Sequence, residues 1–149
     1  MLKEGDPAPT NIELQNQDGK LIKLTDYKGK KIVVYFYPKD DTPGCTTEAK
    51  NFRDSIKEYE DKDIAIFGIS ADSVKSHKNF QTKFDLPFAL LSDPEKTAAK
   101  AFGALDKGNV KRRTWLINED WLIEKAFESV SPSNHNSELC TYYGLKVPK

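Results

Sequence analysis

The chain has 149 residues, and its 23 lysine and arginine residues balance 23 aspartate and glutamate residues. This length predicts one domain spanning residues 1–149, large enough to bury a core without a disulfide scaffold or a structural metal. Hydrophobic residues make up 38% and charged residues 31%, which is typical of a soluble globular protein. The zero net charge gives no general electrostatic reason to expect binding to nucleic acid or to a membrane.

The N-terminus and the cysteines predict the compartment. No stretch of about 18 apolar residues is present, so no membrane span is expected. Residues 1–14 lack the apolar segment of a signal peptide. Two cysteines, Cys45 and Cys140, do not make a disulfide scaffold, and a reduced, cytoplasmic protein is favoured. His77 and His135 have no partners at metal-ligand spacing, so no metal or other cofactor is expected.

Strands and helices are predicted to alternate along the chain. Residues 11–24 are expected to form a short hairpin that turns at Asp18-Gly19. Residues 32–37 and 64–69 are apolar runs typical of strands buried on both faces. The remaining expected elements are helices over 43–60, 73–84, 94–102 and 135–144, a short strand at 90–91, and an antiparallel hairpin of 114–118 with 122–127.

This order of elements predicts the fold class. Alternating strands and helices imply a parallel core sheet, and the late hairpin adds antiparallel strands. The expected fold is α/β and thioredoxin-like, with an N-terminal β-hairpin extension and a mixed central sheet flanked by helices. Such a fold does not by itself define a function.

The segment around Cys45 carries the clearest chemical signal. A loop containing Pro38 follows the strand at 32–37, and Cys45 falls in the first turn of the next helix, with Thr42 as a candidate cap. Free N–H groups and the positive end of the helix dipole stabilise an anion there, and a thiolate is such an anion. The carboxyl edge of a parallel sheet is also where α/β proteins place their sites.

A pair of arginines enters a late strand. Side chains alternate along a strand, so Arg112 and Thr114 should share one face and Arg113 the other. One of these arginines, aimed at the helix of Cys45, would further favour the thiolate. Its planar donors could also hold an oxygen-rich substrate.

The residues around Cys45 resemble a known family. Pro38, Thr42 and Cys45 match the peroxiredoxin pattern Pro-x-x-x-Thr-x-x-Cys, and the wider segment is similar to the PrxQ branch, also called bacterioferritin comigratory protein. The likeness covers nearly the whole chain. It includes residues 5–9, 67–72, 91–93 and 112–117.

The resemblance implies thiol-dependent reduction of hydroperoxides. Cys45 would be the peroxidatic nucleophile and would become a sulfenic acid, and the Thr42 hydroxyl would contact the peroxide. The implied partners are a hydroperoxide substrate and an external thiol reductant, which could be thioredoxin, glutaredoxin or a small thiol. No nucleic acid and no membrane is implied.

The same resemblance implies roles for the residues around the nucleophile. The backbone N–H groups of Gly44 and Cys45, with the Arg112 guanidinium, would stabilise charge as the peroxide bond stretches. Pro38 would pack over the site and limit water. Glu48, one helical turn after Cys45, would orient the arginine.

The chain departs from the family at the resolving cysteine. Many relatives carry this cysteine five residues after the peroxidatic one, where this chain has Lys50, or on the next helix, and residues 73–84 contain none. The remaining thiol, Cys140, is expected in a buried or half-buried position. Two hypotheses follow: a one-cysteine enzyme reduced directly by an external thiol, which we favour, or resolution by Cys140 after local unfolding or across a dimer.

A second departure is Trp121, at a hairpin turn where the family usually has glycine. A tryptophan there must either reshape the turn or be exposed. We expect a monomer or weak homodimer, with self-association through this hairpin as a hypothesis.

Two other classes of function share the fold. A thioredoxin-like disulfide oxidoreductase needs Cys-x-x-Cys, but residues 45–48 read Cys-Thr-Thr-Glu. A peroxide sensor or a chaperone-like interaction protein would not turn over peroxide. Loss of peroxide consumption on Cys45→Ser would separate an enzyme from a chaperone-like protein.

Overall fold

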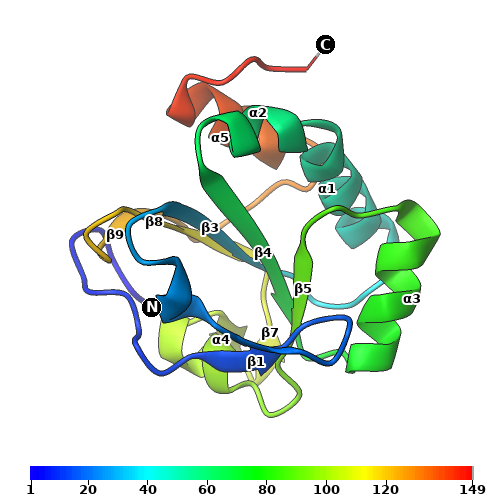
Figure 1. Ribbon diagram of the computed structural model, residues 1–149. Coiled ribbons are helices and arrows are strands. Elements are labelled where there is room, and N and C mark those ends of the chain that lie inside the picture. The colour runs from blue at the N-terminus through cyan, green and yellow to red at the C-terminus, as the bar shows by residue number, and fades with distance from the viewer. Residues whose placement is uncertain (149) are drawn as a thin grey trace.

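A computed structural model describes residues 1–148. The strands of its larger sheet are β1 (Glu13–Gln15), β2 (Leu21–Lys23), β3 (Lys31–Phe36), β4 (Ile64–Ser70), β5 (Ala89–Ser92), β8 (Arg113–Ile117) and β9 (Ile123–Phe127). Within the described residues these seven strands run in the order β2-β1-β5-β4-β3-β8-β9 (Figure 1). A second, two-stranded sheet pairs β6 (Leu105–Asp106) with β7 (Asn109–Val110).

Helices cover both faces of the larger sheet. They are the 3-10 helix η1 (Leu24–Tyr27) and the α-helices α1 (Pro43–Asp54), α2 (Ile56–Asp61), α3 (Val74–Phe84), α4 (Thr97–Phe102) and α5 (His135–Tyr143). Helices α1, α2, α3 and α5 pack on one face, and α4, η1 and the N-terminal segment on the other (Figure 1). From residue 1 to residue 148, no helix combines the length and the apolar character needed to cross a membrane.

The central strand β3 explains why its sequence is apolar at every position. It pairs in parallel with β4 and antiparallel with β8. Val34 and Phe36 enter the core cluster that contains α4, while Val33 and Tyr35 enter the cluster that contains α1 and α5. All four side chains are at most 1% exposed. A strand buried on both faces was predicted here and is confirmed.

The predicted thioredoxin-like α/β fold with a mixed sheet is confirmed. The N-terminal hairpin is part of the same sheet, because β1 pairs antiparallel with β5 through Gln15 and Ser92. The β6–β7 hairpin was not predicted, since two-residue strands leave no periodic pattern in the sequence.

The predicted helix over 43–60 is divided in the structure. Helix α1 ends at Asp54 and α2 begins at Ile56, with Ser55 between them. Ser55 is buried, and its hydroxyl accepts a hydrogen bond of 2.9 Å from the Asn136 side chain in α5. The break therefore matches a tertiary contact that the local pattern does not contain.

The predicted helix over 94–102 begins later than expected, at Thr97. Lys96 has a left-handed backbone with φ of 60°, which is incompatible with a continuous helix. The Asp93 carboxylate then accepts the N–H groups of Ala98 and Ala99 at 3.2 and 2.9 Å. The acidic side chain thus caps the helix from outside.

The expectation that Trp121 would be exposed or would reshape its turn is wrong. Trp121 keeps the glycine-like conformation, with φ of 64°. Its side chain is only 6% exposed, and its indole N–H donates to the Pro9 carbonyl at 3.2 Å. The ring packs within the chain, so the hairpin offers no exposed tryptophan for self-association. Burial of a large aromatic surface offsets the cost of the positive φ.

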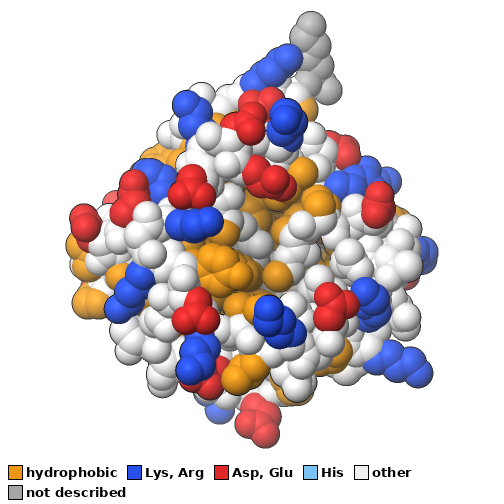
Figure 2. Space-filling model, viewed as in Figure 1, with side chains coloured by type: hydrophobic (Ala, Val, Ile, Leu, Met, Phe, Trp, Pro, Cys, Tyr) orange, Lys and Arg blue, Asp and Glu red, His pale blue; other side chains and the backbone are white. Residues whose placement is uncertain are grey.

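The surface carries charges of both signs. On the face shown in Figure 2, acidic and basic side chains surround a hollow floored by apolar atoms. This mixture agrees with the zero net charge of the chain. No patch of basic side chains large enough to bind a polyanion is visible on this face.

Candidate active site

Cys45 lies in the first turn of α1, after the loop that leaves β3 (Figure 1). Helix α1 begins at Pro43, and Thr42 occupies the N-cap position with an extended backbone. The first helical hydrogen bond runs from the Thr46 N–H to the Thr42 carbonyl at 2.8 Å. The N–H groups of Gly44 and Cys45 therefore precede the hydrogen-bonded turns and remain available to an anion.

Arg112 joins Cys45 to Glu48. Its Nη2 donates to Cys45 Sγ at 3.3 Å, and its Nη1 donates to Glu48 Oε1 at 2.7 Å. Cys45 is 2% exposed and Glu48 1% exposed, so both contacts are shielded from water. Low exposure strengthens the electrostatic interactions of the guanidinium with both partners compared with those of a surface pair.

Sheet pairing brings the arginine to this place. Strand β8 pairs antiparallel with β3, with Arg113 opposite Phe36 at the end of β3 where the loop to α1 begins. Arg113 points to the other face, where its Nη1 donates to the Gly103 carbonyl at 2.7 Å. The predicted division of Arg112 and Arg113 between the two faces is confirmed.

Burial changes the electrostatics of Glu48. Burial raises the pKa of Glu48 to about 7, although Arg112 acts in the opposite direction. Burial acts to lower the pKa of Arg112, but Glu48 and Cys45 raise that pKa above its usual value. Over the described residues, Glu48 Oε2 has no hydrogen-bond partner. The arginine thus remains charged beside the sulfur, and the carboxyl group titrates near neutral pH.

Tyr35 lies beneath the site and was missed by sequence reasoning. Its ring packs on Phe52 of α1 with centroids 4.9 Å apart. Burial raises the pKa of Tyr35, and the nearby Glu48 and Cys45 raise it further, so its hydroxyl stays neutral. The sequence marks Tyr35 only as one member of an apolar strand.

The Thr42 hydroxyl faces the loop rather than the helix. Its Oγ1 donates to the Lys39 carbonyl at 2.9 Å, and its side chain does not cap α1. The hydroxyl proton is therefore used in this bond, and the oxygen lone pairs are left to accept a hydrogen bond from a ligand. Pro38 is itself exposed and lines an open hollow of ≈ 330 Å³ together with Arg112 and the β6–β7 hairpin.

The loop before α5 also approaches the site, which the sequence did not indicate. A Cβ atom at Gly44 would lie 3.1 Å from Arg112 Nη2 and 3.4 Å from Pro132 Cγ. Glycine at this position therefore leaves room for the arginine. Helix α5 is held nearby by a 2.8 Å hydrogen bond between His135 Nε2 and Thr114 Oγ1. Only folding brings these segments together.

Cys140 lies in the interior of α5 and is fully buried. Its Sγ is 3.7 Å from Tyr59 Oη and 3.6 Å from Asn136 Oδ1. Tyr59 also donates to Asn136 at 2.9 Å. The buried position predicted for Cys140 is confirmed, and the neighbouring groups are neutral. Lys50, at the position of the relatives' resolving cysteine, is exposed.

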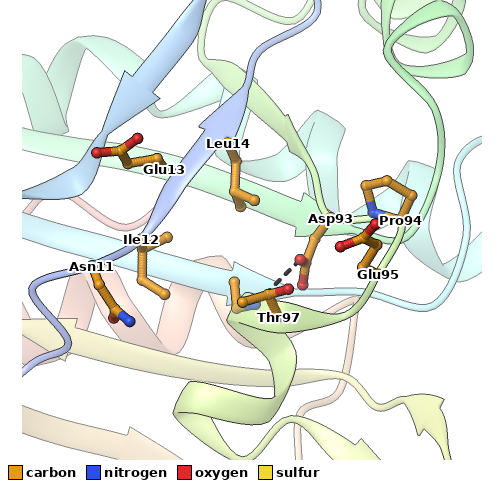
Figure 3. Close-up of a pocket in the computed structure, with 9 residues that line it drawn as sticks. Asn11, Ile12, Glu13, Leu14, Asp93, Pro94, Glu95 and Thr97 are labelled. Carbon is orange, nitrogen blue, oxygen red and sulfur yellow. Dashed lines mark hydrogen bonds between the residues drawn. The ribbon is translucent and has the colours of Figure 1, made fainter.

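A separate pocket of ≈ 180 Å³ lies between β1 and α4 (Figure 3). Of the three carboxylates that line it, Asp93 is committed to capping α4, and the other two are Glu13 and Glu95. Its lining residues, all within the described chain, include none of the Cys45 site. This pocket is therefore separate from the site at the start of α1.

Comparisons with known proteins place the chain in a family. The sequence profile of the AhpC/TSA family matches residues 5–126. Peroxiredoxin Bcp of Bacillus subtilis is 44% identical over 142 residues, which covers 90% of each chain. The match therefore extends well beyond the motif around Cys45.

Solved structures give the same assignment. A cysteine-to-serine variant of PrxQ from Xylella fastidiosa is 31% identical, with a TM-score of 0.93 over 97% of this chain and 96% of that one. The bacterioferritin comigratory protein of Xanthomonas campestris, studied for alkyl peroxide reduction, is 30% identical, with a TM-score of 0.89 over 95% and 97% of the two chains. The chain thus belongs to the AhpC/TSA family and is a peroxiredoxin of the PrxQ, or bacterioferritin comigratory protein, branch.

Proposed function

We propose that this peroxiredoxin reduces hydroperoxides in the cytoplasm through Cys45, with electrons supplied by an external thiol. The observation that carries the proposal is the 3.3 Å contact between Arg112 Nη2 and Cys45 Sγ at the N-terminus of α1. A guanidinium and free N–H groups together favour a thiolate, which is the nucleophilic form of cysteine.

The reaction uses Cys45, Thr42, Arg112 and the free N–H groups of the helix start. The Cys45 thiolate attacks the terminal peroxide oxygen, so that an S–O bond forms as the O–O bond breaks. The Thr42 oxygen accepts a hydrogen bond from the peroxide O–H and aligns it. Arg112 and the N–H groups of Gly44 and Cys45 stabilise negative charge on the oxygens. The leaving oxygen takes a proton and departs as water or an alcohol, and Cys45 becomes a sulfenic acid.

The surface beside the site supports a substrate class. The hollow beside Pro38 and Arg112 is open to solvent and bounded by the β6–β7 hairpin. Of the site residues, Pro38 and Arg112 line this hollow, so it offers space beside the site for the alkyl chain of an organic hydroperoxide. Organic hydroperoxides are therefore proposed as substrates beside hydrogen peroxide, consistent with the alkyl peroxide reduction studied in the Xanthomonas relative.

The reducing half-reaction uses two thiols from outside. The first condenses with the Cys45 sulfenic acid, which forms a mixed disulfide and releases water. The second attacks the mixed disulfide, which releases a free disulfide and the Cys45 thiolate. We place Cys140 outside this cycle, because its sulfur lies in the interior of α5 among the neutral groups of Tyr59 and Asn136 and is not bonded to Cys45. A disulfide between the two would need local opening of the buried core.

A sensor is the competing function, since it would react once and then hold its oxidised state. The test is to supply excess hydrogen peroxide with excess dithiothreitol and to count the peroxide consumed per protein, with Cys45→Ser as the blank. Many equivalents consumed above the blank support an enzyme. One equivalent identifies a sensor that these thiols do not reduce, and consumption equal to the blank contradicts both functions.

A further inference from the structure

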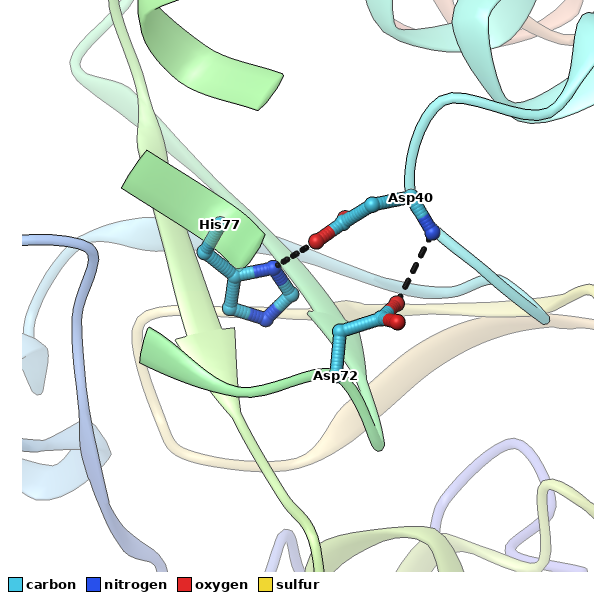
Figure 4. A group of neighbouring side chains, drawn as sticks. All are labelled: Asp40, Asp72 and His77. Carbon is cyan, nitrogen blue, oxygen red and sulfur yellow. Dashed lines mark hydrogen bonds and ion pairs between the residues drawn. The ribbon is translucent and has the colours of Figure 1, made fainter. Parts of the chain in front are cut away.

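Three side chains from separate segments meet beside the loop that leads into α1 (Figure 4). Asp40 follows β3, Asp72 follows β4, and His77 lies in α3. His77 Nδ1 is 2.7 Å from Asp40 Oδ2, and the Asp40 N–H donates to Asp72 Oδ2 at 2.8 Å. His77 is 0% exposed and Asp40 7% exposed. The spacing of these residues in the sequence gave no indication of the cluster.

Hydrogen bonds account for this cluster without a metal. One ligand atom from each of the three residues lies within 4.8 Å of the others. His77 Nε2, however, is 3.0 Å from the Leu91 carbonyl, which only accepts, so this nitrogen carries a proton. Asp72 Oδ2 also accepts the Ser70 hydroxyl at 2.7 Å. A cation would have to displace bonds that are already made.

The contact between His77 and Asp40 contains a second proton. Since Nε2 holds one ring proton, a 2.7 Å approach of Nδ1 to a carboxylate oxygen requires another proton between them. Tyr37 and Ser76 both donate hydroxyl protons to the Asp40 carboxyl group, at 2.6 and 2.8 Å. These donors favour the ionised carboxylate. The pair is therefore a short, buried hydrogen bond with a proton between the two groups, and it joins α3 to the loop.

The loop needs such an anchor. Asp41, directly after Asp40, has φ of 56°, a conformation that persists in non-glycine residues only where the surroundings hold it. Asp40 is held from outside the loop through both its N–H group and its carboxylate. The adjoining Lys39 carbonyl accepts the Thr42 hydroxyl. Fixing Asp40 therefore fixes the carbonyl that orients Thr42.

We propose that His77 is a positioning residue for peroxide reduction, which holds the loop 38–42 through Asp40 so that the Thr42 lone pairs face the peroxide. This inference rests on the proposed function of Cys45. Among residues 1–148, the hydrogen bonds of the His77 ring go to Asp40, Tyr37 and Leu91 and none goes to Arg112. Loss of the ring should therefore misalign the peroxide and leave the thiolate unchanged.

The test compares His77→Gln with His77→Asn. The glutamine amide reaches toward the Nε2 position and can keep the bond to Leu91, whereas the asparagine amide mimics Nδ1 and can keep the bond to Asp40. Rate constants of the reduced protein are measured with hydrogen peroxide and with iodoacetamide, a neutral alkylating agent. In the glutamine variant, the rate constant with peroxide should fall about tenfold or more, and the rate constant with iodoacetamide should fall less than about twofold. The asparagine variant should recover most of the peroxide rate.

Two further variants test whether His77 acts through the contact between the loop 38–42 and the peroxide. Lys83→Ala removes the exposed 2.7 Å ion pair from α3 to Asp41, and it should change neither rate by more than about twofold. In a Thr42→Val background, His77→Gln should cause no further loss, because both changes act on the same contact. If His77→Gln does not fold, Asp40→Ala removes the same pair from the other side and carries the same expectation.

The outcomes separate the two proposals. Equal losses with peroxide and iodoacetamide, equal rates for the two His77 variants, or additive losses with Thr42→Val would each overturn the positioning role. A normal peroxide rate in His77→Gln would overturn it as well, while leaving the proposed function intact. If the unaltered protein fails to oxidise Cys45, the proposed function itself is lost.

Discussion

The two cysteines belong to the same buried core cluster, yet their surroundings differ in one decisive respect. Cys45 is 2% exposed and Cys140 0% exposed, so burial does not separate them. Cys45 meets a charged guanidinium at the start of a helix, whereas Cys140 meets neutral Tyr59 and Asn136 in a helix interior. Charge and helix position, rather than access to solvent, therefore define the candidate nucleophile.

The largest expected effect comes from removing each thiol in turn. Cys45→Ser should abolish peroxide consumption with every thiol donor, because no other group of the site can become a sulfenic acid. Cys140→Ser should keep the rate within about twofold, since the thiol lies outside the proposed cycle. Peroxide consumption followed at 240 nm checks both variants. Complete loss of turnover in Cys140→Ser, with the first reaction intact, would make Cys140 the resolving cysteine.

The second effect tests the charge beside Cys45. Arg112→Ala should lower the rate constant with hydrogen peroxide by about 100-fold, as expected when one charge-stabilising donor is lost. Arg113→Ala is the matched control, because it removes a contact to Gly103 on the opposite face. That variant should lose stability but not peroxide reactivity. Equal rate constants with hydrogen peroxide for the two arginine variants would show that the guanidinium beside Cys45 does not make it the more reactive cysteine.

The third effect is a pH dependence set by Glu48, whose pKa rises from 4.5 to about 7 on burial. The folded protein keeps this proton to a higher pH than the unfolded chain, so stability falls as pH rises from about 4.5 to about 7. Above this pH range, the shift lowers the unfolding free energy by about 3 kcal/mol relative to its value below the range. Glu48→Gln should remove the fall, as measured by urea unfolding at several pH values. A pH profile unchanged by the substitution would contradict the assignment.

The smallest effect concerns packing around Cys140. Cys140→Ala leaves a small cavity beside Tyr59 and should lower the unfolding free energy by about 1 kcal/mol. Urea unfolding measures this loss, and peroxide reduction should not change. A loss of peroxide reduction that tracks the loss of stability would show that the two cysteines are coupled.

The sequence predicted the parts of the site that lie in short motifs. Cys45, Thr42 and Glu48 lie within two turns of one helix start, and strand alternation separated Arg112 from Arg113. The structure places three of these side chains, Cys45, Arg112 and Glu48, in contact. Local chemistry singled out Cys45 at the helix start, and period-two alternation separated the two arginines. The choice of Arg112 and the role of Glu48 came from the resemblance to the peroxiredoxin family.

The rest depends on tertiary contacts that no local pattern contains. Asp40 and His77 are joined by folding across 37 positions. Pro132 reaches Gly44 through the placement of α5. Trp121 was misjudged because the sequence shows a tryptophan at a turn position that favours glycine, but it does not show the hydrogen bond from the indole to Pro9.

The central claim is that Cys45, and not Cys140, is the thiol that peroxide oxidises. The direct measurement is the intact and peptide mass of the reduced protein after one equivalent of hydrogen peroxide, with a nucleophile that traps sulfenic acids. We expect one trapped sulfenic acid on Cys45 of a monomer, with Cys140 left as a thiol. An unmodified Cys45, or oxygen found only on Cys140, would contradict it.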